Sequence, residues 1–133
     1  MSQVKNDHML NLLCGTMVTL VRRDGPDLSA RQLAVFLTCY LNDGAHTVRG
    51  LAAALNVSKP AITRALDRLR VLGLAERKPD PLDRRSVLVR HTPKGQAFLR
   101  EMRAIMAEAS GSQADRDDRA IGQVERLSIR RAG

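Results

Sequence analysis

Residues 47–92 read TVRGLAAALNVSKPAITRALDRLRVLGLAERKPDPLDRRSVLVRHT, and this stretch decides the fold. Thr47 can cap a first helix, and four apolar residues share one face of it: Val48, Leu51, Ala52 and Leu55. Asn56 tolerates the left-handed backbone conformation that ends a helix in a tight turn. The pattern therefore predicts a short helix followed at once by a sharp change of direction.

A second helix is predicted from Ser58, which can cap it, with Pro60 in the first turn, where a missing amide hydrogen costs little. Its apolar stripe consists of Ile62, Leu66, Leu69 and Leu72. The opposite face is polar and basic, with the Ala61 methyl near its start and Asp67 within it. In a helix-turn-helix the second helix enters the major groove. The predicted DNA-binding residues of this helix are Ser58, Lys59, Pro60, Thr63, Arg64 and Arg68.

A β-hairpin wing is predicted after Gly73, with strands near residues 74–78 and 86–91. Two prolines lie in the connecting loop, residues 79–85, and we expect them to prevent a regular ladder there. Arg84 and Arg85 are predicted to bind DNA from the tip of this wing. Asp83 is expected to orient a neighbouring guanidinium group, and Asp67 to pair with an arginine of its own helix, Arg64 or Arg68.

Apolar residues at helical spacing predict further helices on both sides of this region. The upstream helix is expected to run from a cap at Asn6 or Asp7 to about Arg23. The next begins at the capping box Ser29–Gln32 and is expected to bury five residues: Leu33, Phe36, Leu37, Tyr40 and Leu41. A long helix follows from Pro93 to about Ala109. The first helix has more apolar residues than one small face needs, which favours a dimer partner over a role in a monomer core.

The order and spacing of these elements resemble the MarR family of bacterial transcriptional regulators. The most specific parts are the Asp83-Arg84-Arg85-Ser86 wing and the Thr92-Pro93-Lys94-Gly95 helix start. The resemblance implies a mainly α fold with a small β-hairpin wing (an α/β winged helix-turn-helix) and a homodimer with dimerising helices at both ends. It also implies a pseudo-palindromic operator, usually repression, and in many members a small-molecule effector.

The expected domain organisation follows from these elements. Residues 1–28 form an N-terminal dimerisation helix, residues 29–92 the winged helix-turn-helix, and residues 93–110 a C-terminal dimerisation helix. Residues 111–133 are expected to be a flexible or weakly helical tail.

Charge and composition agree with a DNA-binding protein. The 133-residue chain has a net charge of +8, and arginine dominates its 22 basic residues. Arginine pairs well with guanine edges and phosphate, although a GC-rich genome also enriches it. An aromatic content of 2% argues against base stacking on single strands. The chain has no membrane-length apolar run and no recognisable leader, so we expect a cytoplasmic protein without a membrane partner.

The cysteines and histidines offer little chemistry. Cys14 lies near the position at which some MarR-like regulators sense peroxides, but the tyrosines of those proteins are replaced here by Ala30 and Leu33. Cys14 is therefore a candidate redox sensor, with a small buried apolar residue as the alternative for both it and Cys39. Scattered histidines predict no metal site. The absence of catalytic motifs and phosphate-binding loops predicts neither a cofactor nor an enzyme.

The sequence thus predicts a sequence-specific regulator that binds double-stranded DNA as a homodimer, with repression as the default mode. Two alternatives stay open at this stage. One is a non-specific nucleoid or architectural protein, for which the positive charge alone would suffice. The other is a winged-helix protein-interaction module, although such modules usually lack basic residues on the second helix and wing.

Overall fold

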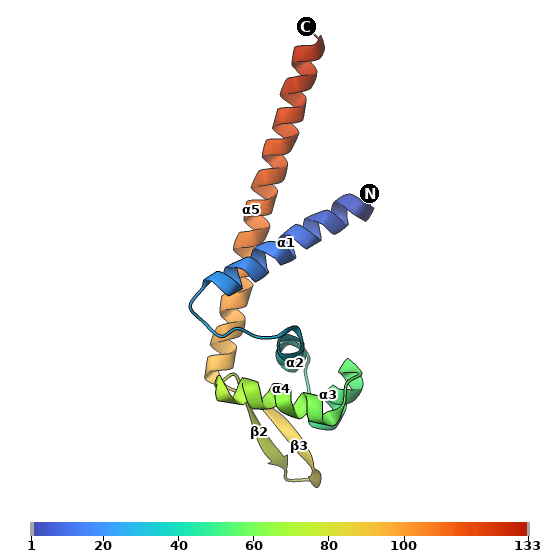
Figure 1. The fold of residues 1–133 in the computed structure, drawn as a ribbon, viewed down its shortest axis with the longest axis vertical. Coiled ribbons are helices and arrows are strands. Elements are labelled where there is room, and N and C mark those ends of the chain that lie inside the picture. Colours follow the sequence, from blue (N-terminus) through green and yellow to red (C-terminus); the bar gives the residue numbers. More distant parts are fainter. Residues whose placement is uncertain (1, 133) are drawn as a thin grey trace. The chain divides into compact units, whose positions relative to one another are not determined.

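The computed structural model describes the backbone of residues 2–132 and the side chains of these residues except 2, 113, 114, 117, 120 and 124–132. In chain order the elements are α1 (Ser2–Arg22), α2 (Ala30–Leu41), β1 (His46–Thr47), α3 (Val48–Leu55), α4 (Lys59–Val71), β2 (Ala75–Asp80), β3 (Asp83–His91) and α5 (Pro93–Ala132) (Figure 1). They form two compact units, one of residues 26–101 and one of residues 1–25 with 102–133. The predicted fold class, mainly helical with a small wing, is confirmed.

The predicted helix boundaries in residues 26–101 are confirmed by their hydrogen bonds. The Thr47 hydroxyl accepts from the Gly50 amide at 3.0 Å, and the Ser58 hydroxyl accepts from the Ala61 amide at 3.2 Å. Asn56 ends α3 with φ 53° and ψ 48°, the left-handed conformation that its side chain tolerates. Ser29 and Gln32 form the reciprocal capping box at the start of α2. Local hydrogen bonds thus set the turn between α3 and α4.

The sheet has one more strand than the hairpin that the sequence predicted. Its order is β1-β3-β2, all antiparallel, and Thr47 of β1 pairs with Leu88. The ladder also continues through Pro79, which pairs with Val87 before an irregularity at Asp80. The expectation that prolines would prevent a ladder over residues 79–85 was therefore wrong. β2 is an edge strand, where a residue without an amide hydrogen is tolerated.

A core of apolar side chains from four helices and the start of β2 holds residues 26–101 together. The buried members are Val35, Phe36, Cys39, Leu51, Ala52, Ala61, Ile62, Ala65, Leu66, Leu69, Leu74, Ala75, Phe98 and Leu99. Two expectations were wrong here: Leu41, the last residue of α2, is 58% exposed, and Ala61 is buried rather than on the polar face of α4. The buried stripe of α4 is therefore wider than its large apolar residues alone indicate.

One tyrosine ties together the two corners of this unit. The Tyr40 hydroxyl donates to the Leu74 carbonyl oxygen at 2.6 Å and accepts from the Thr92 amide at 3.0 Å. The Thr92 hydroxyl donates to the Gly73 carbonyl oxygen at 2.6 Å and accepts from the Gly95 amide at 2.9 Å. We call these five residues the Tyr40 junction. It joins the α4–β2 corner to the β3–α5 corner.

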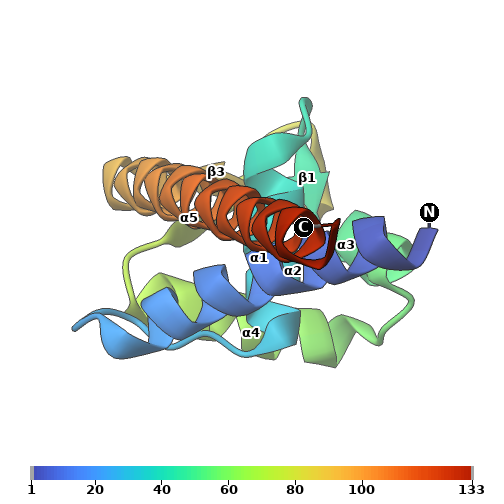
Figure 2. The same cartoon turned by 90° about the horizontal axis from the view of Figure 1, so that it is seen from above.

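The second unit contains α1 and the C-terminal part of α5, which cross at an angle and diverge toward the two ends of the chain (Figure 1; Figure 2 gives the view from above). They approach closely at Gly15, where an added Cβ would lie 3.5 Å from the Ala109 Cβ. α1 begins at Ser2, earlier than the predicted caps Asn6 and Asp7, and α5 continues beyond the expected end near residue 110. No proline follows Pro93, so nothing after it interrupts the helical hydrogen bonds.

We expect Gly95→Ala to destabilise the fold, because an added Cβ would overlap the Tyr40 hydroxyl and crowd the Leu74 carbonyl oxygen. Such overpacking costs about 1–3 kcal/mol. Gly111→Ala is the matched control, since nothing lies within 4 Å of its added Cβ. Alanine there should stabilise the helix by about 0.5–1 kcal/mol. Chemical denaturation measures both changes, and equal free energies of unfolding for the two variants would contradict the role of the junction.

Candidate nucleic-acid interface

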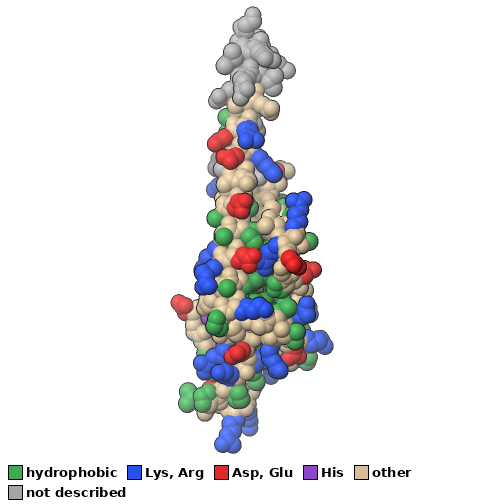
Figure 3. Space-filling model, turned by 90° about the vertical axis from the view of Figure 1, so that its left-hand side faces the viewer, with side chains coloured by type: hydrophobic (Ala, Val, Ile, Leu, Met, Phe, Trp, Pro, Cys, Tyr) green, Lys and Arg blue, Asp and Glu red, His purple; other side chains and the backbone are tan. Residues whose placement is uncertain are grey.

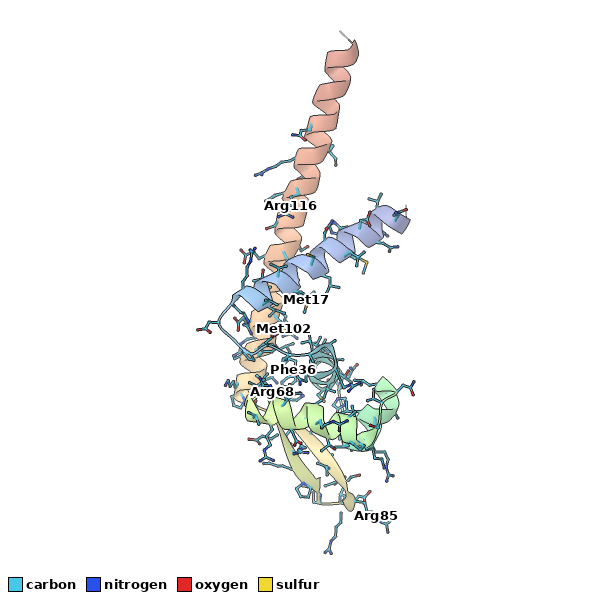
Figure 4. The ribbon with its side chains drawn as sticks, viewed as in Figure 1. Met17, Phe36, Arg68, Arg85, Met102 and Arg116 are labelled. Carbon is cyan, nitrogen blue, oxygen red and sulfur yellow. The ribbon has the colours of Figure 1, made fainter. Side chains whose placement is uncertain are left out.

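The outer face of α4 presents the residues that the sequence predicted to read DNA. Ser58, Lys59, Pro60, Arg64 and Arg68 are exposed, and Thr63 is half-buried. Figure 4 shows Arg68 on α4. These residues lie opposite the buried stripe of the helix, so the core holds the helix while its basic face stays open.

Asp67 lies on the same outer face and pairs with Arg77 of β2. The pairing differs from the prediction, which expected Arg64 or Arg68 as partner. Strand alternation directs Arg77 toward α4, where its side chain is 21% exposed, while the Asp67 side chain is 54% exposed. The pair links α4 to the wing, and it leaves Arg64 and Arg68 without this carboxylate as a partner.

The tip of the wing is a two-residue turn fixed by two aspartates. Asp80 Oδ1 accepts from the Leu82 amide at 2.9 Å, and Asp83 Oδ1 accepts from the Arg85 amide at 3.0 Å. Asp83 therefore fixes the backbone of the turn, whereas the sequence predicted that it would orient a guanidinium group. A short side chain so close to the turn reaches its own backbone amides first.

Arg84 and Arg85 lie at the start of β3 rather than in a loop, and both are exposed. Arg85 lies at the far end of the hairpin (Figure 4). Leu82, in the turn itself, is 95% exposed. The wing thus extends two guanidinium groups and one apolar side chain beyond the body of this unit.

A groove of about 660 Å³ lies where the end of α4, the strand β2 and the start of α5 meet. We call it the α4–β2 groove. Its basic lining residues are Arg70, Arg77, Lys78 and Lys94. None of them was among the predicted site residues, because the groove combines three elements and no single element shows it as a pattern. On the face shown in Figure 3, Lys and Arg side chains are spread over the surface, with Asp and Glu side chains between them.

The cysteines lie in different surroundings. Cys14 is exposed on α1 and lines a hollow of about 420 Å³ between α1 and α5. Its role as a redox sensor stays a prediction. Cys39 is buried, and burial raises the pKa of its thiol to about 11. Among the described residues, no group of three His, Cys, Asp or Glu side chains could hold a metal ion. None of the described helices is long and apolar enough to cross a membrane.

Comparison with known proteins identifies this arrangement. A family model described as MarR family matches residues 26–86, which extend from before α2 into β3. The multiple antibiotic resistance protein MarR of Salmonella typhimurium is 40% identical over 75 residues. Over the winged helix-turn-helix, the chain is therefore similar to the MarR family. That match covers 56% of this chain and 51% of the Salmonella protein, so the chain spans about half the length of this curated MarR relative.

Solved structures of other proteins share the fold. The transcriptional regulator Tm0710 of Thermotoga maritima superposes with a TM-score of 0.67 at 20% identity, over 96% of this chain and 84% of that chain. Bordetella bronchiseptica BpsR, whose DNA binding is regulated by 6-hydroxynicotinic acid, superposes with a TM-score of 0.57 at 22% identity, over 96% and 92%. The chain therefore has the fold of these solved structures.

We expect the buried Cys39 thiol to resist alkylation in the folded protein. A Cys14→Ser variant leaves Cys39 as the one thiol. Because its pKa is raised from 9.0 to about 11, its thiolate population at pH 8 should be about a hundredfold below that of an unfolded cysteine. The rate of maleimide labelling in the folded protein should keep rising between pH 9 and 11, whereas the unfolded protein should level off. Equal rates in folded and unfolded protein at pH 8 would contradict this environment.

Proposed function

We propose that this protein is a MarR-family, sequence-specific regulator of transcription that binds double-stranded DNA as a homodimer and represses by occupying a pseudo-palindromic operator. The observation that carries the proposal is the exposed basic face of α4 in the same compact unit as the two arginines of the wing. The protein acts by binding, not by catalysis, and its place of action is the cytoplasm.

In this proposal α4 lies in the major groove. Ser58, Lys59, Pro60 and Thr63 are near its N-terminal end, where a recognition helix meets base edges, and Arg64 follows within the next turn. A guanidinium group can form two hydrogen bonds with a guanine, which makes Arg64 the leading candidate for reading sequence. Arg68 lies one turn farther along the same face.

The wing reaches the adjacent minor groove or its phosphates through Arg84 and Arg85. Their side chains are exposed next to a turn that Asp80 and Asp83 fix. A fixed turn lowers the entropy lost when the arginines bind. Because phosphate contacts carry no sequence information, the wing supplies mainly affinity and orientation.

The homodimer is supported by apolar side chains that the single chain leaves exposed. On α1 these are Val4, Met9, Leu10, Leu13, Met17, Val18 and Val21, and on α5 they include Met106 and Ile121. An exposed apolar surface of this extent marks an interaction site. A second copy would cover it and would supply the second recognition helix that an inverted repeat requires.

A small-molecule effector is a further proposed partner, by analogy with BpsR, whose DNA binding 6-hydroxynicotinic acid regulates. A non-specific architectural protein remains the rival function, and competition by random DNA separates it from a regulator with a defined operator.

The contrast between Arg64→Ala and Arg85→Ala tests the proposal. Operator fragments are first selected from genomic DNA by retention on the protein. Arg64→Ala should lose about 1–3 kcal/mol on the operator but little on random DNA. Arg85→Ala should weaken both, and should reduce the slope of log K against log salt by about 0.9 for each lost phosphate contact. Uniform retention of all genomic fragments by the wild-type protein would favour the architectural rival.

The dimer is tested by placing charge on the exposed face of α1. Leu10 and Leu13 are 61% and 55% exposed in the single chain, so the Leu10→Glu/Leu13→Glu variant should fold but dissociate. Its sedimentation coefficient should be that of a monomer, and its operator affinity should fall. Leu41→Glu, at a residue of similar exposure (58%) on α2, is the control and should stay dimeric. A dimeric double variant would contradict the role of α1.

A further inference from the structure

We propose that the α4–β2 groove binds phosphates of the DNA strand that runs between the major groove occupied by α4 and the minor groove reached by the wing. The inference rests on the proposed function and adds a third DNA contact to it. Its ligand chemistry is the phosphodiester group, and its side chains are Arg70, Arg77, Lys78 and Lys94.

The charge of the groove fits an anion. Four basic residues line it against one carboxylate, Glu76. Arg77 shares its charge with Asp67, but Arg70, Lys78 and Lys94 form no ion pair with any side chain that the structure describes. Unpaired cations around a hollow attract a negatively charged ligand, and neutralising phosphates releases counterions from DNA.

The position of the groove fits a DNA strand better than an isolated anion. Asp67 and Arg70 are three residues apart, so they share one side of α4, and the Asp67–Arg77 pair shows that this side faces β2. The groove therefore lies in the angle between recognition helix and wing. When a helix fills the major groove and a wing reaches the next minor groove, the sugar-phosphate strand between those grooves must pass this angle.

The floor of the groove lets a sugar-phosphate strand come close to the protein backbone. Gly73, two residues after the end of α4, has φ 75°, and a Cβ added there would lie 3.1 Å from Lys94 Cδ. The aliphatic stem of Lys94 thus passes over a residue without a side chain. Ala75 and Pro93 complete a small apolar base beneath the charged groups. A sugar-phosphate strand matches this surface, because it has an apolar sugar edge and a charged phosphate group.

The test compares Arg70→Ala and Lys94→Ala with Arg100→Ala, which removes the same charge from an exposed position of α5 outside the groove. Operator affinity is measured over a range of salt concentrations. Each groove variant should reduce the slope of log K against log salt by about 0.9, with base preference unchanged, while Arg100→Ala should keep the wild-type slope. Groove variants with the slope of Arg100→Ala would overturn the inference.

Neutral methylphosphonates then locate the contact. When they replace the phosphates of the strand between the two grooves, wild-type affinity should fall to that of the Arg70→Ala/Lys94→Ala variant, and the double substitution should cost nothing further. Additive losses would place the contact elsewhere and overturn the inference.

Binding of tripolyphosphate tests whether the ligand of the groove is a soluble phosphorylated molecule and not a DNA phosphate. If Arg70→Ala abolishes tripolyphosphate binding but leaves the DNA salt slope unchanged, the groove binds a soluble phosphorylated molecule and the DNA assignment is wrong. In that case Arg64→Ala and Arg85→Ala still weaken DNA binding and the proposed function stands. Failure of the wild-type protein to bind any duplex would reject the proposed function together with the groove contact.

Discussion

The Tyr40 junction is the constraint on which residues 26–101, the unit with the proposed DNA-binding surface, depend. One hydroxyl group satisfies the Leu74 carbonyl at the start of the wing and the Thr92 amide at its end, 2.6 and 3.0 Å away. The ring of Tyr40 stacks between Phe36 and His91 at centroid distances of 4.3 and 4.0 Å, so the hydroxyl is held in place by packing. Because both ends of the hairpin meet at this one residue of α2, the wing cannot turn relative to α4 without breaking these bonds.

The two compact units differ in how far their large apolar side chains are buried, and this difference suits different roles. Residues 26–101 close a core around Phe36, Ile62 and Leu66, each of which is almost fully buried. α1 instead keeps most of its large apolar side chains exposed, although Gly15 lets it approach α5 closely. A closed core suits the proposed role of this unit, which is to present fixed side chains to a rigid duplex. An open apolar face suits a unit that completes its packing with a partner.

The fold could be predicted because its helix boundaries depend on residues that are close in sequence. The site could be predicted only in part, because it depends on contacts between segments that are far apart in sequence. The caps at Thr47 and Ser58 and the left-handed Asn56 depend on neighbours within a few residues, so the sequence shows them directly. β1 has two residues, too few for a periodic signal, and forms because Thr47 lies opposite Leu88. The partner of Asp67 depends on the register of β2 against α4. The basic groove depends on three elements meeting, which no spacing along one element encodes.

The Asp67–Arg77 pair shows why the recognition surface needs its wing in place. Asp67 lies on the face of α4 that the proposal directs toward DNA, where an unpaired carboxylate would repel phosphate. An exposed ion pair stabilises a fold by only about 0–1 kcal/mol, so stability does not explain it. Its effect is electrostatic: Arg77 neutralises Asp67 only while β2 keeps its register, and the Tyr40 junction holds the start of β2. In this proposal, the charge on the DNA-binding face of α4 therefore depends partly on the Tyr40 hydroxyl group of α2. This hydroxyl contacts neither Asp67 nor the DNA.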